Sequence, residues 1–501
     1  MTHLGVGKTL LMVVAALVII LGTAGLNLTT APEARGGLSQ LAVAAAIGGA
    51  AVLLGVLIWG ELKRHRPQTP WIAEHSTDSF WLRDAGIYDD PIRAPLNASD
   101  SKTDVLIIGG GFTGLSTAWH LKQENPDLKV TLIDAARCGY GASGRNVGWC
   151  MAQNLNLPGT GSKFVEPAHQ MMREGVSIIK QLSEHHGVGC DFTPASIVDL
   201  STAKNPNKKF KPVLEVCGTF GFQAKLLETE TVRARYQSDA FTGGAVYQDG
   251  SASVHPGKLG RSMRDLVLNA SVEVHEGTTV ERLDLRGNTP IAITDFGRIE
   301  AGQVIIATNA FTKSFGEFSD RYIPVYSAMI ATEPLSDAQL KSTGFKRGEL
   351  LSIRGKGPEM SFANVSVDNR IVFGGGAPVI YYDGAFASGN HRGHSESLSQ
   401  YLTGTIWPQL AGVKIDHKWG GMLAISRDLV GGIGTHPKHH SVHYALAYSG
   451  EGVSTSFASG KTLAQMVSGQ DTELTRNLLV HRNIGWIPGE PLRSVALKFL
   501  F

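Results

Sequence analysis

The sequence lacks a surplus of either charge, and it contains few cysteines. Lys and Arg total 46 against 44 Asp and Glu in 501 residues, so no bulk electrostatic attraction points to nucleic acid as a partner. The four cysteines are widely spaced and form no Cys-x-x-Cys pair, which argues against a disulfide framework and against a zinc site. A reducing compartment is therefore expected, and any partner must be recognised from local features.

Charged residues are also missing from two long stretches near the N-terminus. Residues 9–32 and 36–60 contain none, and a helix that crosses a bilayer needs about 20 mostly apolar residues. Lys8 precedes the first stretch and Lys63 follows the second, and basic flanks stay on the cytoplasmic side of a membrane. We therefore expect residues 1–66 to form a two-span transmembrane anchor in the inner (cell) membrane, with the rest of the chain in the cytoplasm.

The anchor leaves two choices open. Its second stretch is rich in Ala and Gly, which let helices approach closely in lipid, so it can pair as a hairpin or form a homo-oligomer. Residues 1–31 can also be read as a cleaved signal peptide. Residues 67–100 are polar and contain Pro, and we expect a linker whose aromatic residues Trp71, Phe80 and Trp81 pack on the domain or lie near lipid headgroups.

A nucleotide-binding pattern follows the linker. Residues 104–108 form a nearly continuous apolar run, as in a buried parallel strand. Residues 109–114 match G-x-G-x-x-G, a helical segment follows at 115–123, and a second apolar strand at 129–133 ends in Asp134. This is the order of a βαβ unit whose glycines admit a pyrophosphate and whose acid binds the adenosine ribose. The acid disfavours a 2′-phosphate, so NADP is not expected and FAD and NAD both remain open.

Two more glycine-rich turns indicate a ligand that extends beyond this unit. The first, at residues 139–146, comes soon after Asp134. Near the C-terminus, a predicted strand at 444–448 leads through a turn at 449–452 into a predicted helix at 453–467. The N–H groups and the helix N-terminus at that turn can stabilise negative charge on the pyrimidine edge of a flavin.

The chain resembles the D-amino-acid oxidase-like FAD oxidoreductases, and within them the gamma-glutamylputrescine oxidase-type branch. The resemblance extends over about residues 70–501 and rests on several ordered blocks. These are TDVLIIGGGFTGLSTAWHL, GYGASGRNVGW, DGSASVHPGKL, VIIATNAFT, RIVFGGG, WPQLAGVKIDHKWGG and YSGEGV.

The resemblance implies an α/β fold with two interleaved parts. A Rossmann-like FAD-binding domain of the glutathione reductase type would take residues 101–190, 245–320 and 412–501. A substrate domain with an antiparallel sheet would take residues 191–244 and 321–411 and would cover the flavin.

The same resemblance implies which residues hold FAD. The pyrophosphate loop would contain Gly109, Gly111, Phe112, Thr113 and Gly114, and the acid that binds the ribose would be Asp134. The second turn would contain Ala142, Ser143, Gly144, Arg145 and Asn146. The backbone of Val280 would meet adenine, Thr308 would lie in the block that closes over the cofactor, and the flavin pyrimidine edge would face Gly450, Glu451 and Gly452.

Departures from the family pattern occur at several positions. Glu451 stands where relatives commonly have histidine, and we expect its side chain to point outward, because an acid facing the flavin disfavours the reduced anion. Gly420 and Gly421 lie in the block where some relatives attach flavin through a cysteine, so the FAD is expected to be non-covalent. Val372 replaces a lysine that helps oxygen react in the same relatives, which puts fast use of oxygen in doubt.

The family oxidises a carbon–nitrogen bond by passing hydride from the carbon to the flavin. Water hydrolyses the resulting imine, so no protein nucleophile is required. Arginine can grip a substrate carboxylate through two hydrogen bonds, although an ordinary surface or ion-paired role is commoner for such residues. The candidates for the substrate pocket are Trp149, Arg321, Tyr326, Tyr381, Tyr382 and Arg427.

Two other patterns are not assigned to this chemistry. Residues 5–9 resemble the end of a Walker loop, but Thr2 stands in place of its first glycine and no strand precedes it. A cluster of histidines sits in a short polar loop without apparent carboxylate or cysteine partners, so no metal site is expected. The cluster comprises His436, His439, His440 and His443.

The sequence thus predicts a membrane-anchored FAD-dependent dehydrogenase or oxidase of an amine or amino acid, with a quinone as a candidate electron acceptor. An amine oxidase that uses oxygen remains open. So do a flavin-binding membrane scaffold without activity and an NAD-dependent dehydrogenase.

Overall fold

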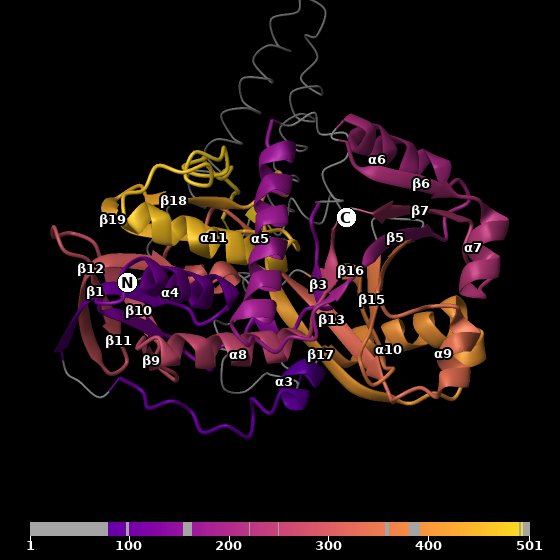
Figure 1. The fold of residues 1–501 in the computed structure, drawn as a ribbon, viewed down its shortest axis with the longest axis horizontal. Helices are drawn as coiled ribbons and strands as arrows, with labels where there is room; N and C mark the ends of the chain where they lie inside the picture. The colour runs from indigo at the N-terminus through magenta and orange to yellow at the C-terminus, as the bar shows by residue number, and fades with distance from the viewer. Residues whose placement is uncertain are drawn as a thin grey trace, which may run out of the picture. The chain divides into compact units, whose positions relative to one another are not determined.

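The computed structural model describes residues 79–96, 100–153, 163–219, 221–248, 250–355, 360–379, 391–489 and 492–493. Nearly all of them belong to one compact unit, residues 70–487 (Figure 1). Within this described part of the chain, no helix combines the length and the apolar character that crossing a membrane requires. The predicted anchor at residues 1–66 lies outside the described residues, as do Tyr381 and Tyr382.

The first of two large sheets is built around continuous apolar strands. Its strands are β1 (Asp100–Ile108), β2 (Val130–Ile133), β9 (Glu273–His275), β10 (Val280–Asp284), β11 (Ile291–Thr294), β12 (Gly297–Ile306), β18 (Gly432–His436) and β19 (His439–Leu446). β1 pairs in parallel with β2 and β12, β2 with β9, and β12 with β19. β10 and β11 add an antiparallel edge, and β18 pairs antiparallel with β19. Residues 105–108 and all of β2 are buried, as expected of parallel strands with both faces covered.

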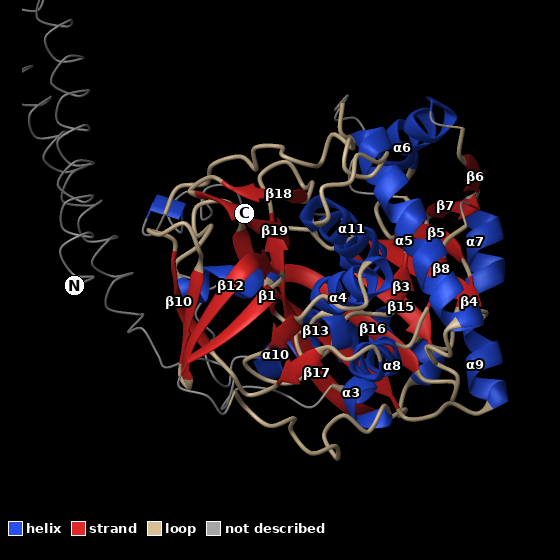
Figure 2. Ribbon diagram, turned by 60° about the vertical axis from the view of Figure 1, so that its left-hand side comes forward, coloured by secondary structure: helices blue, strands red, loops and turns tan. Residues whose placement is uncertain are grey.

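The helices of this part lie over the sheet and over one another. They are α4 (Phe112–Glu124), α5 (Val165–His185), α8 (Pro256–Asn269) and α11 (Gly452–Val467). α11 packs against α4 and α5, and α8 packs against α4. Figure 2 shows α4 and α11 beside each other next to the strands β1 and β19. The predicted βαβ unit is confirmed, since α4 connects the parallel neighbours β1 and β2.

The second sheet is almost entirely antiparallel, as the sequence predicted for the substrate domain. Its strands are β5 (Ser196–Ser201), β6 (Gln223–Leu227), β7 (Gly243–Gln248), β13 (Ile323–Thr332), β14 (Glu349–Arg354), β15 (Met360–Val365), β16 (Ile371–Val379) and β17 (Ile415–Ile425). They follow the order β17-β13-β16-β15-β14-β5-β7-β6, in which β14 and β5 form the parallel pair. The helices of this part are α6 (Asn207–Thr219), α7 (Thr229–Tyr236), α9 (Asp337–Thr343) and α10 (His391–Tyr401).

Strand pairing assigns two segments differently from the sequence. β7 and β17 belong to the second sheet, whereas residues 245–320 and 412–501 were expected in the FAD-binding domain. The reason is long-range pairing, because β17 pairs with β13 along nearly its whole length. The division into two domains stays a prediction, since both sheets lie in one compact unit.

The end of the expected linker is structured. A short helix, α3 (Phe80–Asp84), precedes β1, and Phe80 and Trp81 are only 4 % and 2 % exposed. Of the two expectations for these aromatic residues, the structure therefore supports packing on the domain. Gly257 of α8 makes the contact possible, because a Cβ there would lie 2.0 Å from the Trp81 carbonyl oxygen.

The crossing of α5 and α11 predicts a stability effect at Gly175. A Cβ on Gly175 would lie 1.8 Å from the carbonyl oxygen of Ser454 in α11. Gly175→Ala must therefore separate the helices, and we expect it to lower the free energy of unfolding by about 1–3 kcal/mol. Gly218→Ala in α6 is the matched control, because nothing lies within 4 Å of the Cβ it adds. Thermal unfolding compares the two variants, and equal Tm values would contradict the close contact.

Candidate active site

The turn between β1 and α4 brings a strand end and a helix start into close contact. Gly109 has a φ of +109°, a conformation that glycine adopts readily and other residues avoid. A Cβ on Gly114 would lie 1.9 Å from the Gly109 carbonyl oxygen. α4 begins directly after Gly111, its N-cap residue, and a helix leaves its first N–H groups without partners within the helix. This arrangement suits the binding of a pyrophosphate.

Asp134 follows β2, and its carboxylate is held by backbone N–H groups on both sides. It accepts hydrogen bonds from Gly110 at 2.7 Å and from Ala136 at 2.8 Å. Burial raises the pKa of this carboxyl to about 6, although the two hydrogen bonds act to lower it. The nearby Glu276 carboxylate also raises the pKa of Asp134. The predicted ribose acid thus lies against the glycine loop.

The segment before β10 runs alongside Asp134. Gly277 donates its N–H to the Ala136 carbonyl at 2.9 Å. The buried Glu276 carboxylate accepts hydrogen bonds from the N–H groups of Cys138 at 2.8 Å and Arg93 at 3.0 Å. Val280 begins β10 just beyond, so the predicted adenine contact follows a segment that is bonded to the loop after Asp134.

Thr308 and Asn309 connect the glycine loop to the C-terminal strand. Thr308 precedes a short 3₁₀ helix, η2 (Asn309–Phe315), and its methyl carbon would lie 3.1 Å from a Cβ on Gly109. The Asn309 side chain accepts a hydrogen bond from the Ala447 N–H at 2.9 Å. Thr308 therefore lies beside the loop, as its predicted role requires.

The second glycine-rich turn contacts the start of α4 directly. Its central residues form a 3₁₀ turn, η1 (Ala142–Gly144), in which the Ser143 hydroxyl accepts a hydrogen bond from the Phe112 N–H at 2.9 Å. Asn146 closes the turn by donating its side-chain amide to the Ser143 carbonyl at 2.8 Å. These bonds join two predicted FAD-binding segments.

Arg145 connects the same turn to the second sheet. Its side chain is buried, and its Nε donates to the Tyr140 carbonyl at 2.8 Å while Nη1 donates to the Gly420 carbonyl at 3.3 Å. In return, Trp419 of β17 donates its ring N–H to the Arg145 carbonyl at 3.0 Å. A buried guanidinium is therefore positioned where the two sheets meet the second turn.

The C-terminal turn also reaches the start of α4. The Tyr448 hydroxyl lies 2.7 Å from the Thr113 hydroxyl, and Gly450 adopts a φ of +104° before α11 begins. Glu451 is the N-cap residue of α11, and its side chain is only 5 % exposed. The expectation that Glu451 points outward is therefore wrong. The turn is closed by a hydrogen bond from the Glu451 N–H to the Tyr448 carbonyl at 3.0 Å, and Glu451 is buried among the residues around it.

An apolar cluster borders this region from the second sheet. Trp149 and Trp419 belong to it, together with Val372 and Met329. The Trp149 ring meets Phe362 edge-on, with 5.3 Å between centroids. Because Trp419 also binds Arg145, the cluster adjoins the second turn, and a role for Trp149 in the substrate pocket stays a prediction.

The other substrate-pocket candidates occupy separate places. Arg321 forms an ion pair with Asp320 at 3.2 Å and donates to Asn483 at 3.3 Å, which gives it a structural role. Arg427 is exposed in a turn after β17. Tyr326 is buried, and its hydroxyl would lie 2.1 Å from a Cβ on Gly420. Of these three residues, only Tyr326 packs against Gly420, whose carbonyl accepts a hydrogen bond from Arg145. A role for Tyr326 in substrate binding stays a prediction.

Sequence reasoning missed the contribution of residues 79–84. Ser79 donates its hydroxyl to the Gly144 carbonyl at 2.9 Å, and Trp81 donates its ring N–H to the Asn146 carbonyl at 2.8 Å. Both bonds end on the second turn. The adjacent aromatic residues in an otherwise polar linker were the available signal.

His255, which lies in the block DGSASVHPGKL, has a structural role. As N-cap of α8, it accepts a hydrogen bond from the Lys258 N–H through Nδ1 at 3.0 Å. Its Nε2 lies 3.0 Å from the Asp84 carboxylate. The histidine therefore joins α8 to α3.

The C-terminal histidines lie in the strands β18 and β19 and not in a polar loop, so that expectation is wrong. The rings of His439 and His440 stack with 5.3 Å between their centroids. His436 lies 2.9 Å from the Glu317 carboxylate, so the expectation that it lacks a carboxylate partner is wrong. His443 contacts Gln303 at 3.1 Å, and burial lowers the pKa of His443 to about 4. Among the described residues, no group of His, Cys, Asp and Glu is arranged to hold a metal ion. The four cysteines are all buried, and none of them forms a disulfide.

The residues present fit an extended dinucleotide. The glycine loop, Asp134, the second turn and the C-terminal turn meet around the first turn of α4 through the bonds at Phe112 and Thr113. Neither Gly109 nor Gly114 can carry a side chain in this loop, because a Cβ would lie 2.8 Å from the Ala307 carbonyl oxygen and 1.9 Å from the Gly109 carbonyl oxygen, respectively.

Comparison with known proteins agrees with this geometry. Residues 104–466 match the family described as FAD dependent oxidoreductase. Gamma-glutamylputrescine oxidoreductase of Escherichia coli (strain K12) is 28% identical over 422 residues, which cover 79% of this chain and 90% of that protein. The probable oxidoreductase OrdL of Rhizobium meliloti (strain 1021) is 28% identical over 444 residues, covering 86% of this chain and 97% of that protein.

Solved structures share the fold. Glycine oxidase from Geobacillus kaustophilus has a TM-score of 0.65 at 19% identity, covering 77% of this chain and 100% of that chain. L-proline dehydrogenase from P. horikoshii has a TM-score of 0.62 at 20% identity, covering 75% of this chain and 96% of that chain. At these identities the likeness establishes the fold.

The raised pKa of Asp134 predicts that FAD binding depends on pH. Ribose hydroxyls donate hydrogen bonds to the ionised carboxylate, so below a pKa of about 6 the apoprotein must first release a proton. We expect its affinity for FAD to fall by up to roughly tenfold per pH unit below that value. Flavin fluorescence titrations from about pH 5 to about pH 8 measure this. The Asp134→Asn variant should bind FAD more weakly, and its affinity should no longer fall as the pH decreases. If the variant keeps the pH dependence of the parent protein, a group other than Asp134 causes that dependence.

The buried position of Glu451 predicts an effect on the reduction potential of the flavin. An acid close to the ring opposes the negative charge gained on reduction. We expect Glu451→Gln to raise the midpoint potential by on the order of 30 mV, the shift that a tenfold change in equilibrium constant gives a two-electron couple. Anaerobic redox titration measures it, with the exposed acid variant Glu473→Gln as control. Equal potentials in the two variants would place the Glu451 side chain away from the ring.

Proposed function

The chain belongs to the FAD dependent oxidoreductase family, and from this premise we propose that it oxidises the carbon–nitrogen bond of an amine or amino acid. The observation that carries the proposal is the meeting of three distant segments at the first turn of α4. Ser143 reaches Phe112, and Tyr448 reaches Thr113. FAD bound in this site supplies the hydride acceptor.

The chain itself supplies position and a water-poor environment. The glycine loop and Asp134 hold the adenosine and pyrophosphate end, and the turn at 449–452 offers N–H groups to the flavin end. The apolar cluster around Trp149 and Trp419 excludes water from the neighbouring space. No side chain is required as a nucleophile, because hydride leaves the substrate carbon directly.

The names of the relatives support the substrate class. They refer to gamma-glutamylputrescine, glycine and L-proline, and each of these contains nitrogen bonded to an oxidisable carbon. An amine or amino acid is the chemistry that the three share.

We place the enzyme at the cell membrane, with the catalytic domain in the cytoplasm. Support comes from the uncharged stretches at residues 9–32 and 36–60 and from the basic residues Lys8 and Lys63 that flank them. Association of copies through these stretches stays a prediction.

A quinone in the bilayer is the electron acceptor that suits this placement. Val372 favours it over oxygen, because Val372 is fully buried in the cluster with Trp149 and Trp419 and provides no positive charge there. Negative charge that develops on oxygen is therefore left without a stabilising cation at this position.

The substrate class is tested by the colour of the protein. We expect purified full-length protein to be yellow and to bleach under anaerobic conditions with at least one member of a panel of amines and amino acids, because hydride transfer reduces the flavin. Visible absorbance measures the bleaching, and alcohols of matching carbon skeleton serve as controls. FAD that stays oxidised with every nitrogen compound would favour the scaffold without activity.

The electron acceptor is tested after photochemical reduction, which needs no substrate. We expect a soluble quinone analogue to reoxidise the flavin faster than oxygen by at least about tenfold. Val372→Lys should accelerate the reaction with oxygen, and Val372→Met, of similar length without charge, should not. Reoxidation by oxygen alone would overturn the quinone proposal in favour of an oxygen-using oxidase.

A further inference from the structure

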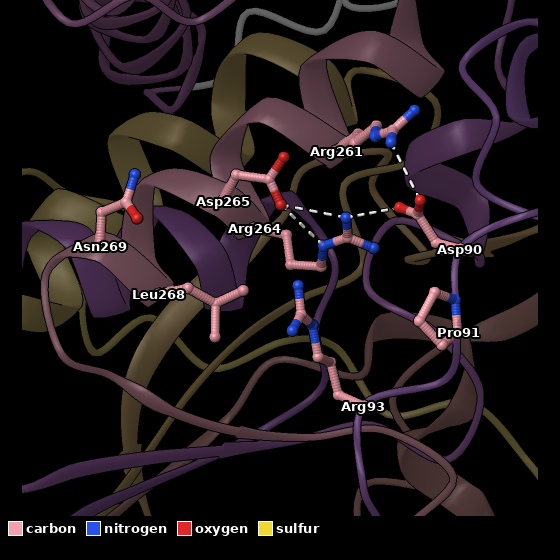
Figure 3. A pocket seen from close by; sticks show the side chains of 8 residues that line it. All are labelled: Asp90, Pro91, Arg93, Arg261, Arg264, Asp265, Leu268 and Asn269. Carbon is pink, nitrogen blue, oxygen red and sulfur yellow. Dashed lines mark hydrogen bonds and ion pairs between the residues drawn. The ribbon is translucent and has the colours of Figure 1, made fainter.

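A pocket lies between α8 and residues 90–93, apart from the FAD-binding residues. Its volume is about 470 Å³, which is within the range of small-molecule sites. Unlike most such sites, it is lined largely by polar side chains (Figure 3). Its ionic residues are Arg93, Arg261 and Arg264 against Asp90 and Asp265, so the wall has more positive than negative groups.

Two of the arginines are fixed in place by Asp90. Arg264 is only 3 % exposed, and its Nη2 donates to Asp90 at 2.7 Å and to Asp265 at 3.0 Å. Arg261 donates to the other oxygen of Asp90 at 2.9 Å. Asp90 is thus shared between two guanidinium groups. Their positions are set by the protein and need no ligand.

The third arginine supplies the unbalanced charge. The Arg93 side chain is exposed and forms no hydrogen bond or ion pair with another described residue, although its positive charge helps to lower the pKa of Asp90. Its backbone is fixed nevertheless, because its N–H donates to the buried Glu276 carboxylate. Figure 3 shows the Arg93 guanidinium turned toward Arg264. Two like charges that face each other across a cavity attract an anion between them.

We propose that this pocket binds a phosphate group, carried by a small molecule or by a lipid headgroup, through Arg93 together with Arg261 and Arg264. The planar guanidinium matches phosphate oxygens in pairs. A phosphate ester presents three terminal oxygens and close to two negative charges, so it can engage three guanidinium groups better than a carboxylate with two oxygens and one charge. The volume exceeds that of the phosphate itself, and the side chain of Leu268 on the wall can contact the organic part.

The binding test uses full-length protein loaded with FAD, so that the pyrophosphate loop is already occupied. Isothermal titration with glycerol 3-phosphate is the main measurement, with succinate as the carboxylate probe and sodium chloride at equal ionic strength as the salt control. We expect saturable binding of glycerol 3-phosphate and weaker binding of succinate.

The matched variants are Arg93→Gln and Arg298→Gln. Both arginines are exposed, so neither change should alter unfolding by more than about 0.5 kcal/mol. We expect Arg93→Gln to weaken glycerol 3-phosphate binding by roughly tenfold or more and Arg298→Gln on β12 to leave it unchanged. The proposal is wrong if Arg93→Gln binds glycerol 3-phosphate as tightly as the parent protein does. It is also wrong if Arg298→Gln loses as much affinity as Arg93→Gln, or if succinate binds as tightly as glycerol 3-phosphate.

The source of the phosphate is decided by competition. A short-chain soluble phosphatidic acid displaces glycerol 3-phosphate at lower concentration than its own headgroup if the pocket accepts a lipid. Displacement that needs equal or higher concentrations assigns the site to a soluble phosphate ester. In both cases Arg93→Gln must weaken the displacing ligand too.

Discussion

The site depends on one close contact, in which the first turn of α4 lies against the end of β1. The carbonyl oxygen of Gly109 occupies the space that a side chain on Gly114 would need. This contact directs the helix start toward the cofactor space and makes Phe112 and Thr113 accessible to other segments. Ser143 and Tyr448, which are 31 and 335 positions away, bind there. The rest of the site is organised around that helix start.

The segment that follows the predicted anchor is part of the same organisation. Ser79 and Trp81 hold the carbonyl groups of Gly144 and Asn146, and Arg93 shares Glu276 with Cys138. Backbone groups of the second turn and of the loop after Asp134 are thus bonded to a segment outside both sheets. Residues 79–96 are therefore bonded to two of the segments that are predicted to hold FAD.

The electrostatic environment of the site combines features with opposite effects. Arg145 brings a buried cation to the second turn, whereas Glu451 brings a buried acid to the C-terminal turn. The cluster around Val372 contains no charged side chain, and its polar atoms are the tryptophan ring nitrogens, the Tyr247 hydroxyl and the Cys217 thiol. On the proposed function, these groups act in opposite directions on the negative charge that the flavin gains on reduction.

The sequence by itself determined the βαβ unit, the glycine loop, Asp134 and the final turn and helix, because each depends on periodicity or on glycine spacing within a short segment. The final strand was predicted at residues 444–448, but β19 begins earlier, at His439, and ends at Leu446. Helix α4 extended only a few residues beyond its predicted bounds. Tertiary structure alone decided that β17 pairs in the second sheet, that Glu451 is buried, that His436 meets Glu317 and that Trp81 binds the second turn. These features join residues far apart in the chain, and no local pattern specifies which distant backbone or side chain will lie beside them.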